Sequence, residues 1–204
     1  MNNLKHFVRC LPLLVLLATL PACTHTAKVN VKPTALPAHA RHTARVALVL
    51  DESFNNYQFE FKMAGDKFVY PFGPSLNGYA RNVSEHCFSK VTTYPTVQAV
   101  TGQEADLILQ PKALKAEHAS GMMAWSDRKF TLQVEWTARD RSNKNTVWLQ
   151  SFTAQGVNSA GNAFSGKEHE RILFQRLFDD LTLKTAEAIQ NSPELKAVTA
   201  GTTP

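Results

Sequence analysis

An unbroken alternation of apolar and polar residues over 130–139 constrains the fold of this chain most strongly. Its apolar members are Phe130, Leu132, Val134, Trp136 and Ala138. Strict alternation over this length indicates a half-buried strand, with one face in a core and the other in water. The polar residues 140–145 predict a turn, and residues 146–155 predict a second long strand that pairs back on the first. The chain is therefore expected to build an antiparallel sheet with one apolar face.

Two amphipathic helices are expected to cover that face. Gly73-Pro74-Ser75 is typical of a helix start, and apolar residues follow at spacings of three and four to about Ser89. Ser165-Gly166-Lys167-Glu168 fits a capping box, and the apolar stripe after it predicts a helix to about Asn191, just before Pro193. Each stripe is one-sided, so each helix should bury one face against the sheet.

Shorter apolar runs predict the remaining strands. These runs are 44–51, 57–62, 68–72, 91–94 and 105–110, and the last is expected to continue past Pro111 to about Glu117, at an edge or with a bulge. Run 44–51 is continuously apolar, which is typical of a strand buried on both faces, and 57–62 is expected to pair with it as a hairpin. The elements together predict an α/β (α+β) fold, a two-layer sandwich of a mostly antiparallel sheet with two amphipathic helices.

The composition agrees with a single globular domain. The chain has 204 residues, 44% of them apolar and 19% charged, which excludes a disordered chain, a collagen-like chain and a coiled coil. Three cysteines are too few for a scaffold held together by disulfides. The domain is expected over 46–191, with a loose C-terminal tail over 192–204.

The N-terminus has the layout of a bacterial export signal. Lys5 and Arg9 precede an apolar stretch over 10–20, which is shorter than the roughly 20 residues that a membrane-spanning helix needs. Leu20-Pro21-Ala22-Cys23 follows, and it resembles a bacterial lipobox. The resemblance implies that a signal peptide, 1–22, is removed and that Cys23 carries diacylglycerol and an N-linked acyl chain such as palmitate. The alternative is an ordinary signal peptide cleaved after Ala22, with Cys23 incidental.

Lipid on Cys23 implies that the protein is held to a membrane. More than one acyl chain makes such an anchor stable without a transmembrane helix. Thr24 stands where an Asp would imply retention in the inner membrane, so the outer membrane, on its periplasmic side, is the expected location. Residues 23–45 are small, polar and interrupted by prolines, and they predict a flexible tether with an r.m.s. span of roughly 25 Å.

The formal charge of +5 comes from the predicted signal peptide, 1–22, and the predicted tether, 23–45. The basic residues there, which have no acidic neighbours, are Lys5, Arg9, Lys28, Lys32, Arg41 and Arg45. In the tether they either attract anionic headgroups or only keep it solvated. The body is nearly neutral and lacks a motif of interleaved aromatic and basic residues, so nucleic acid is not an expected partner.

No pattern in the chain indicates catalysis, a cofactor or a metal site. There is no phosphate-binding loop, nucleophile elbow, Cys-x-x-Cys pair or His-Glu-x-x-His motif. Structural or solvated roles are expected for the weaker candidates, which are Asp51-Glu52, Asp179-Asp180, the histidines 25, 39 and 42, and Glu85-His86-Cys87. Cys87 is expected to be a buried, unreactive thiol. The sequence therefore predicts a protein that is not an enzyme.

One loop offers a candidate contact surface. Residues 119–127 carry Met122, Met123 and Trp125 among small and polar residues. Met adapts to irregular contacts, and Trp is enriched at binding hot spots. These side chains either anchor a partner protein or fold back over one end of the core.

Several features of the predicted body occur in an order that resembles a known class of proteins. They are the strand Val46-Ala47-Leu48-Val49-Leu50-Asp51, the helix start Phe72-Gly73-Pro74-Ser75-Leu76, Val147-Trp148 after a charged turn, and the closing helix. Their order resembles small proteobacterial envelope lipoproteins, including lipopolysaccharide-assembly and transporter-auxiliary lipoproteins. The resemblance implies a non-enzymatic accessory or binding subunit of an outer-membrane or periplasmic complex, with an envelope protein as partner. The alternative is a periplasmic module that binds a small molecule or lipid between sheet and helices. The oligomeric state stays open.

Overall fold

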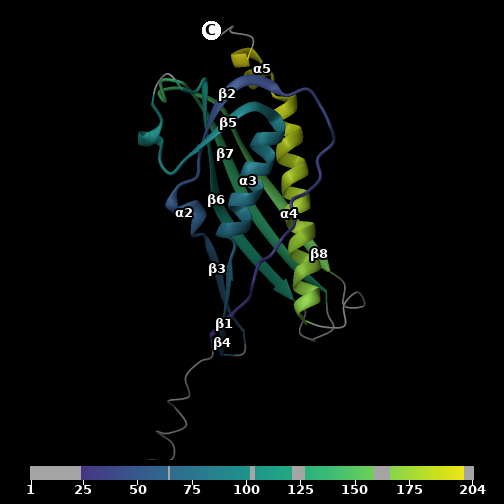
Figure 1. Cartoon of the computed structure of the whole chain (residues 1–204). Helices are drawn as coiled ribbons and strands as arrows, with labels where there is room; N and C mark the ends of the chain where they lie inside the picture. Colours follow the sequence, from purple (N-terminus) through teal and green to yellow (C-terminus); the bar gives the residue numbers. More distant parts are fainter. Residues whose placement is uncertain (1–23, 64, 102–103, 121–126, 159–165, 200–204) are drawn as a thin grey trace, which may run out of the picture.

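A five-stranded mixed sheet forms the centre of the computed structural model, which describes residues 24–63, 65–101, 104–120, 127–158 and 166–199. Its strands are β2 (His42–Val49), β5 (Phe88–Tyr94), β6 (Leu107–Ser120), β7 (Arg128–Asp140) and β8 (Thr146–Asn158). They lie in the order β5-β2-β6-β7-β8 (Figure 1). β2 is parallel to both of its neighbours, and β6, β7 and β8 form an antiparallel meander.

The alternating pattern over 130–139 is confirmed in β7. Its five apolar side chains are at most 1% exposed. β8 pairs with β7 from Arg128–Asn158 at one end to Arg139–Thr146 at the other, and it adds Phe152 and Ala154 to the same face. The two predicted strands therefore build one wall of the core.

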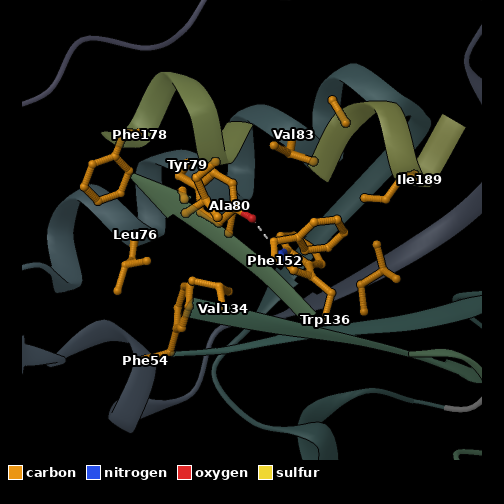
Figure 2. Packing of buried hydrophobic residues seen from close by; sticks show 14 of the residues in the cluster. Phe54, Leu76, Tyr79, Ala80, Val83, Val134, Trp136, Phe152, Phe178 and Ile189 are labelled. Carbon is orange, nitrogen blue, oxygen red and sulfur yellow. Dashed lines mark hydrogen bonds between the residues drawn. The ribbon is translucent and has the colours of Figure 1, made fainter. Parts of the chain in front are cut away.

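Both predicted helices lie on that wall. They are α3 (Gly73–Cys87) and α4 (Gly166–Asn191), and Figure 1 shows them side by side over one face of the sheet. Figure 2 shows Tyr79 of α3 reaching Trp136 of β7, and Leu76 of α3 and Phe178 of α4 belong to the same core cluster. The two-layer α+β sandwich is confirmed. No helix in the described ranges is both long and apolar enough to cross a bilayer.

β6 continues past Pro111, as predicted. Only residues 107–109 of β6 pair with β2, so β7 is the one strand that pairs with β6 at the proline. The register with β7 shifts between Ala113 and Lys115, which is the expected bulge.

The predicted hairpin between 44–51 and 57–62 is wrong. β3 (Gln58–Met63) instead pairs antiparallel with β4 (Asp66–Pro71), and β1 (Thr24–Thr26) joins β4 in parallel, which makes a separate three-stranded sheet. The short helix α2 (Glu52–Asn55) turns the chain away after β2. β2 is apolar on both faces, and two parallel neighbours keep it buried.

The loop before β6 covers the second face of β2. It includes the short 3-10 helix η1 (Val97–Ala99). A small apolar cluster of Ala47, Val49, Ala105 and Ile108 forms under this loop, on the side of the sheet away from α3 and α4.

The predicted loose tail over 192–204 is wrong for its first part. Residues Pro193–Thr199 form the helix α5, and Leu195 is fully buried. The backbone N–H of Leu195 donates to the hydroxyl oxygen of Ser192 at 3.2 Å, which caps the helix start. Burial of Leu195 contributes about 1.5–3 kcal/mol toward offsetting the entropy lost on ordering this short segment.

The predicted flexible tether is wrong for residues 24–45. β1 and the start of β2 occupy its two ends, and the extended segment 27–41 runs between them over the helices (Figure 1). Val29, Val31 and Leu36 pack against the main core. The sequence did not predict these contacts because the residues that pack against the segment lie more than 40 positions away in the chain.

Candidate functional site

The residues predicted to carry function lie outside the described ranges. Cys23, the expected lipidation site, directly precedes β1, and Met122, Met123 and Trp125 fall between β6 and β7. The flanking Ser120 and Arg128 pair with each other, and Arg128 pairs with Asn158 on its other side. The contact role of the loop therefore stays a prediction.

The described residues that follow Cys23, 24–41, form an N-terminal segment that packs on the helices. Lys32 and Gln175 of α4 exchange two hydrogen bonds, from the Lys32 N–H at 2.9 Å and to its carbonyl oxygen at 3.1 Å. Thr34 donates its hydroxyl to a carboxylate oxygen of Asp179 at 2.6 Å. On the other side, Asn82 of α3 donates to the carbonyl oxygen of Thr34 at 3.0 Å. Side chains of both helices thus hold the segment in the groove between α3 and α4.

A small cavity remains beneath this segment. It has a volume of about 50 Å³ and lies between Val31, Tyr79 and Phe178. A space of this size holds a water molecule or two and excludes a metabolite or an acyl chain. The N-terminal segment therefore fills the groove that a ligand between the helices would need.

A cluster of polar side chains gathers where the segment reaches the C-terminal ends of α3 and α4. The rings of His39 and His86 lie with centroids 4.2 Å apart, and the amide of Gln190 lies 2.8 Å from Nδ1 of His39. The Nε2 atoms of both rings are buried without a hydrogen-bond partner. Burial and the nearby His39 lower the pKa of His86. In the part of the chain that the structure describes, no three ligating side chains gather in a metal-binding group.

Two neighbours of this cluster are buried as well. His42 lies with Nε2 3.2 Å from the carbonyl oxygen of Ile189, and burial lowers the pKa of its ring. The Cys87 thiol is fully buried, and burial raises its pKa to about 12. A thiol with this pKa carries almost no thiolate near neutral pH, which agrees with the unreactive role expected from the sequence. The solvated role expected for His39 and His42 is wrong, because both pack against the body.

The acidic residues singled out in the sequence have separate structural partners. Asp51 caps α2, since its carboxylate accepts from the Phe54 N–H at 2.9 Å. Asp179 holds the N-terminal segment, whereas Asp180 accepts the backbone N–H of Gln155 on β8 at 3.0 Å. The two adjacent carboxylates therefore point to different elements.

Charged side chains of α4 cap the outer edge of β8. Arg176 donates to the carbonyl oxygen of Val157 at 2.6 Å, and Lys184 donates to that of Thr153 at 3.0 Å. Together with Asp180 they occupy backbone groups that another strand would need for pairing. Strand addition at this part of β8 is thereby disfavoured.

The outer face of β7 and β8, away from the helices, is largely polar. On β7 it presents half-buried residues such as Gln133 and Glu135, and on β8 it presents exposed ones such as Thr153. Two large apolar side chains stand on it singly, Leu149 at 59% exposure and Val157 at 41%. The face is not the flat apolar patch that marks a permanent interface.

Two open depressions lie at the surface. One, of about 460 Å³, lies between Val97 and Arg141, and the other, of about 450 Å³, lies between Ser151 of β8 and Lys184 of α4. Both are shallow and open to solvent rather than enclosed between sheet and helices.

Comparison with known proteins shows the fold and goes no further. No family model matches the chain, and no curated protein matches it in sequence. Among solved structures, a Xanthomonas campestris protein of the family DUF330 aligns with a TM-score of 0.55 at 10% identity, over 88% of this chain and 99% of that one. A minor lipoprotein from Acinetobacter baumannii aligns with a TM-score of 0.44 at 13% identity, over 76% and 93% of the two chains. Of these two likenesses, the first is close enough to show a shared fold.

Proposed function

We propose that this chain is an envelope lipoprotein, anchored by lipid on Cys23 to the periplasmic side of the outer membrane. The observation that carries the proposal is the lipobox-like Leu20-Pro21-Ala22-Cys23, which follows a charged start and a short apolar stretch. The first described residue after it, Thr24, already belongs to a strand of the body. The lipid therefore attaches directly to a folded domain.

We further propose that the domain is a non-enzymatic accessory subunit that binds an envelope protein. Support comes from the roles of its reactive side chains. Asp51, Asp179 and Asp180 hold structural elements, and Cys87 is buried with a raised pKa. None of these groups is left facing a cavity that would receive a substrate.

The outer face of β7 and β8 is the surface we assign to the partner. It is largely polar with single exposed apolar side chains, which fits an interface that forms between two independently folded proteins. Leu149, at 59% exposure, supplies an apolar anchor within it. The capped edge of β8 directs a partner to this face rather than to strand addition.

Site-specific photocrosslinking in intact cells tests this assignment. A photoreactive phenylalanine analogue replaces Leu149 on the outer face or, as the matched control, Arg81 on the exposed side of α3. The proposal predicts a discrete adduct of higher mass from position 149 and none from position 81. No adduct at position 149, whether or not one forms at position 81, would remove the outer face from the proposal.

The alternative of a small-molecule or lipid-binding module gains no support from the described residues. It requires an enclosed cavity of several hundred Å³ between sheet and helices. That space holds the core side chains, and the groove between the helices holds the N-terminal segment. The 50 Å³ that remains is too small for such a ligand.

A further inference from the structure

The strand register places the start of the described chain beside two lysines. Thr24 of β1 lies opposite Lys67 of β4, and Lys67 lies opposite Lys62 of β3. Adjacent strands are about 4.8 Å apart, so both lysine backbones lie within roughly 10 Å of Thr24. Cys23 is bonded to Thr24, which leaves no linker between the expected lipid and this sheet.

The β3–β4 hairpin presents an apolar side chain at the same end. Met63, the last residue of β3, is 47% exposed. Its side chain lies on the same side of β3 as Phe59 and Phe61. Those two rings are partly buried, whereas Met63 is exposed. An exposed thioether at the end of a hairpin strand, next to Lys62 and opposite Asp66, matches the headgroup boundary of a bilayer, where apolar tips insert and lysines stay in contact with phosphate.

Aromatic contacts fasten this hairpin rigidly to the body. Phe61 stacks on Phe68 across the hairpin at 5.1 Å, and Phe59 meets Phe130 of β7 edge-on at 5.4 Å. The hydroxyl of Tyr70 donates to the carboxylate of Glu170 on α4 at 3.0 Å. The hairpin therefore cannot tilt away from a surface independently of the domain.

Charge at this end is compatible with anionic lipid. Lys67 forms an ion pair with Glu60 at 2.8 Å, whereas Lys62 is exposed beside Met63. His25 lies 3.3 Å from Asp66. A lysine near an anionic surface contributes about 1 kcal/mol of attraction, and the exposed Lys62 supplies it near the anchor, whereas Glu60 offsets the charge of Lys67.

We propose that this end of the body lies directly on the bilayer. The membrane-facing end consists of Thr24, Lys62, Met63 and Lys67, with Met63 among the lipid headgroups. The proposal rests on the lipid anchor proposed above, and it replaces a domain on a long tether with a domain held at the surface. β7 has 13 residues and starts near the hairpin, so at about 3.4 Å per residue its far end lies up to roughly 40 Å from the hairpin.

Fluorescence quenching from lipid tests the orientation. The full lipidated chain is incorporated into vesicles of phosphatidylethanolamine and phosphatidylglycerol that contain a spin-labelled quencher near the headgroups. A solvent-sensitive dye is attached at Met63→Cys or, as the matched control, at Lys144→Cys in the exposed turn between β7 and β8. Lipid blocks Cys23 and burial protects Cys87, so the introduced thiol takes the label.

The expected result is strong quenching at position 63 and none at position 144. Vesicle flotation is measured on the same samples, and it separates the two proposals. A chain that does not float lacks the anchor and overturns the proposed function. A chain that floats with the position 63 dye unquenched, or with both dyes quenched equally, keeps the anchor and overturns the orientation.

A linker variant isolates the role of the direct connection. About 20 Gly and Ser residues inserted between Cys23 and Thr24 give a coil with an r.m.s. span of roughly 25 Å. The variant should still float, and quenching at position 63 should fall to the level of position 144. Full quenching in the linker variant would overturn the claim that the short connection holds this end at the surface.

Discussion

The indole nitrogen of Trp136 on β7 donates a hydrogen bond of 2.8 Å to the hydroxyl oxygen of Tyr79 on α3 (Figure 2). The Tyr79 hydroxyl lies 2.7 Å from that of Thr185 on α4. Thr185 donates its own proton to the carbonyl oxygen of Leu181 at 2.8 Å, so Tyr79 donates to Thr185. One directed chain of hydrogen bonds therefore joins the sheet to both helices inside the core.

Removal of the Tyr79 hydroxyl should destabilise the protein. Tyr79→Phe leaves the buried Trp136 N–H without its acceptor, which should cost about 1–3 kcal/mol in the free energy of unfolding. Trp136→Ala also removes a large side chain from a fully buried site, and it should cost about 3–5 kcal/mol. Urea unfolding of the three proteins measures both values. A Trp136→Ala protein as stable as the wild type would contradict the described core.

Gly156 marks a close approach between β8 and α4. A Cβ at this position would lie 2.1 Å from the carbonyl oxygen of Leu173, so Gly156→Ala should force strand and helix apart and cost about 1–3 kcal/mol. Gly78 on α3 is the matched control, because a Cβ there meets nothing within 4 Å. Gly78→Ala should leave the free energy of unfolding unchanged or raise it by up to about 1 kcal/mol. Equal losses in both variants would show that the β8–α4 contact is described incorrectly.

The docking of the N-terminal segment depends on Asp179. Asp179→Ala removes the acceptor of the Thr34 hydroxyl, and loss of a hydrogen bond to a charged group costs about 1.5–3 kcal/mol. Trypsin should therefore cleave after Lys28 roughly tenfold faster or more than in the wild type. Asp180→Ala, on the same helix but bonded to β8, should leave this rate unchanged. Immediate cleavage of the wild type after Lys28 would show that this segment is a flexible tether and is not docked.

Stability should fall in mild acid because the His42 ring is buried and the His86 and His118 rings are partly buried. Burial lowers the pKa of His42, His86 and His118, so the unfolded chain binds these protons at a higher pH than the folded protein does. The free energy of unfolding should be highest above the unfolded pKa of about 6.5 and should decrease as the pH falls below it. The depressed pKa of Asp106 matters only in stronger acid, below about pH 4.

Urea midpoints between about pH 7.5 and about pH 5 measure this dependence. His42→Gln keeps an amide that can donate to the Ile189 carbonyl oxygen but does not titrate, so it should flatten the curve. A midpoint that rises toward pH 5 in the wild type would contradict the burial of these rings.

Local patterns predicted the long strands and helices closely. The β7 and β8 boundaries and the extent of α3 follow from alternation and from spacing of apolar residues, which a single element determines. The order of strands does not follow from such patterns. The partners of β2 lie at 88–94 and 107–109, and the choice between them and a nearby hairpin depends on what covers each face.

For the candidate site as well, local patterns predict some residues, and others depend on contacts between distant parts of the chain. Cys23 is predicted as a lipidation site from the four residues 20–23, whereas the docked segment depends on contacts such as Lys32–Gln175 that join positions 143 apart. A faint signal was present, since Val29 and Val31 alternate with polar residues. The membrane-facing end depends on the register of β1 against β4, which no local pattern reports.

The lipid on Cys23 is the central claim, and one measurement tests it most directly. Cells that express the wild type or Cys23→Ser are labelled with radioactive palmitate, and the mass of each purified protein is determined. The wild type should carry label and begin at residue 23, whereas Cys23→Ser should carry no label and keep residues 1–22. Label on Cys23→Ser, or a wild-type protein that begins at residue 23 without lipid, would contradict the account.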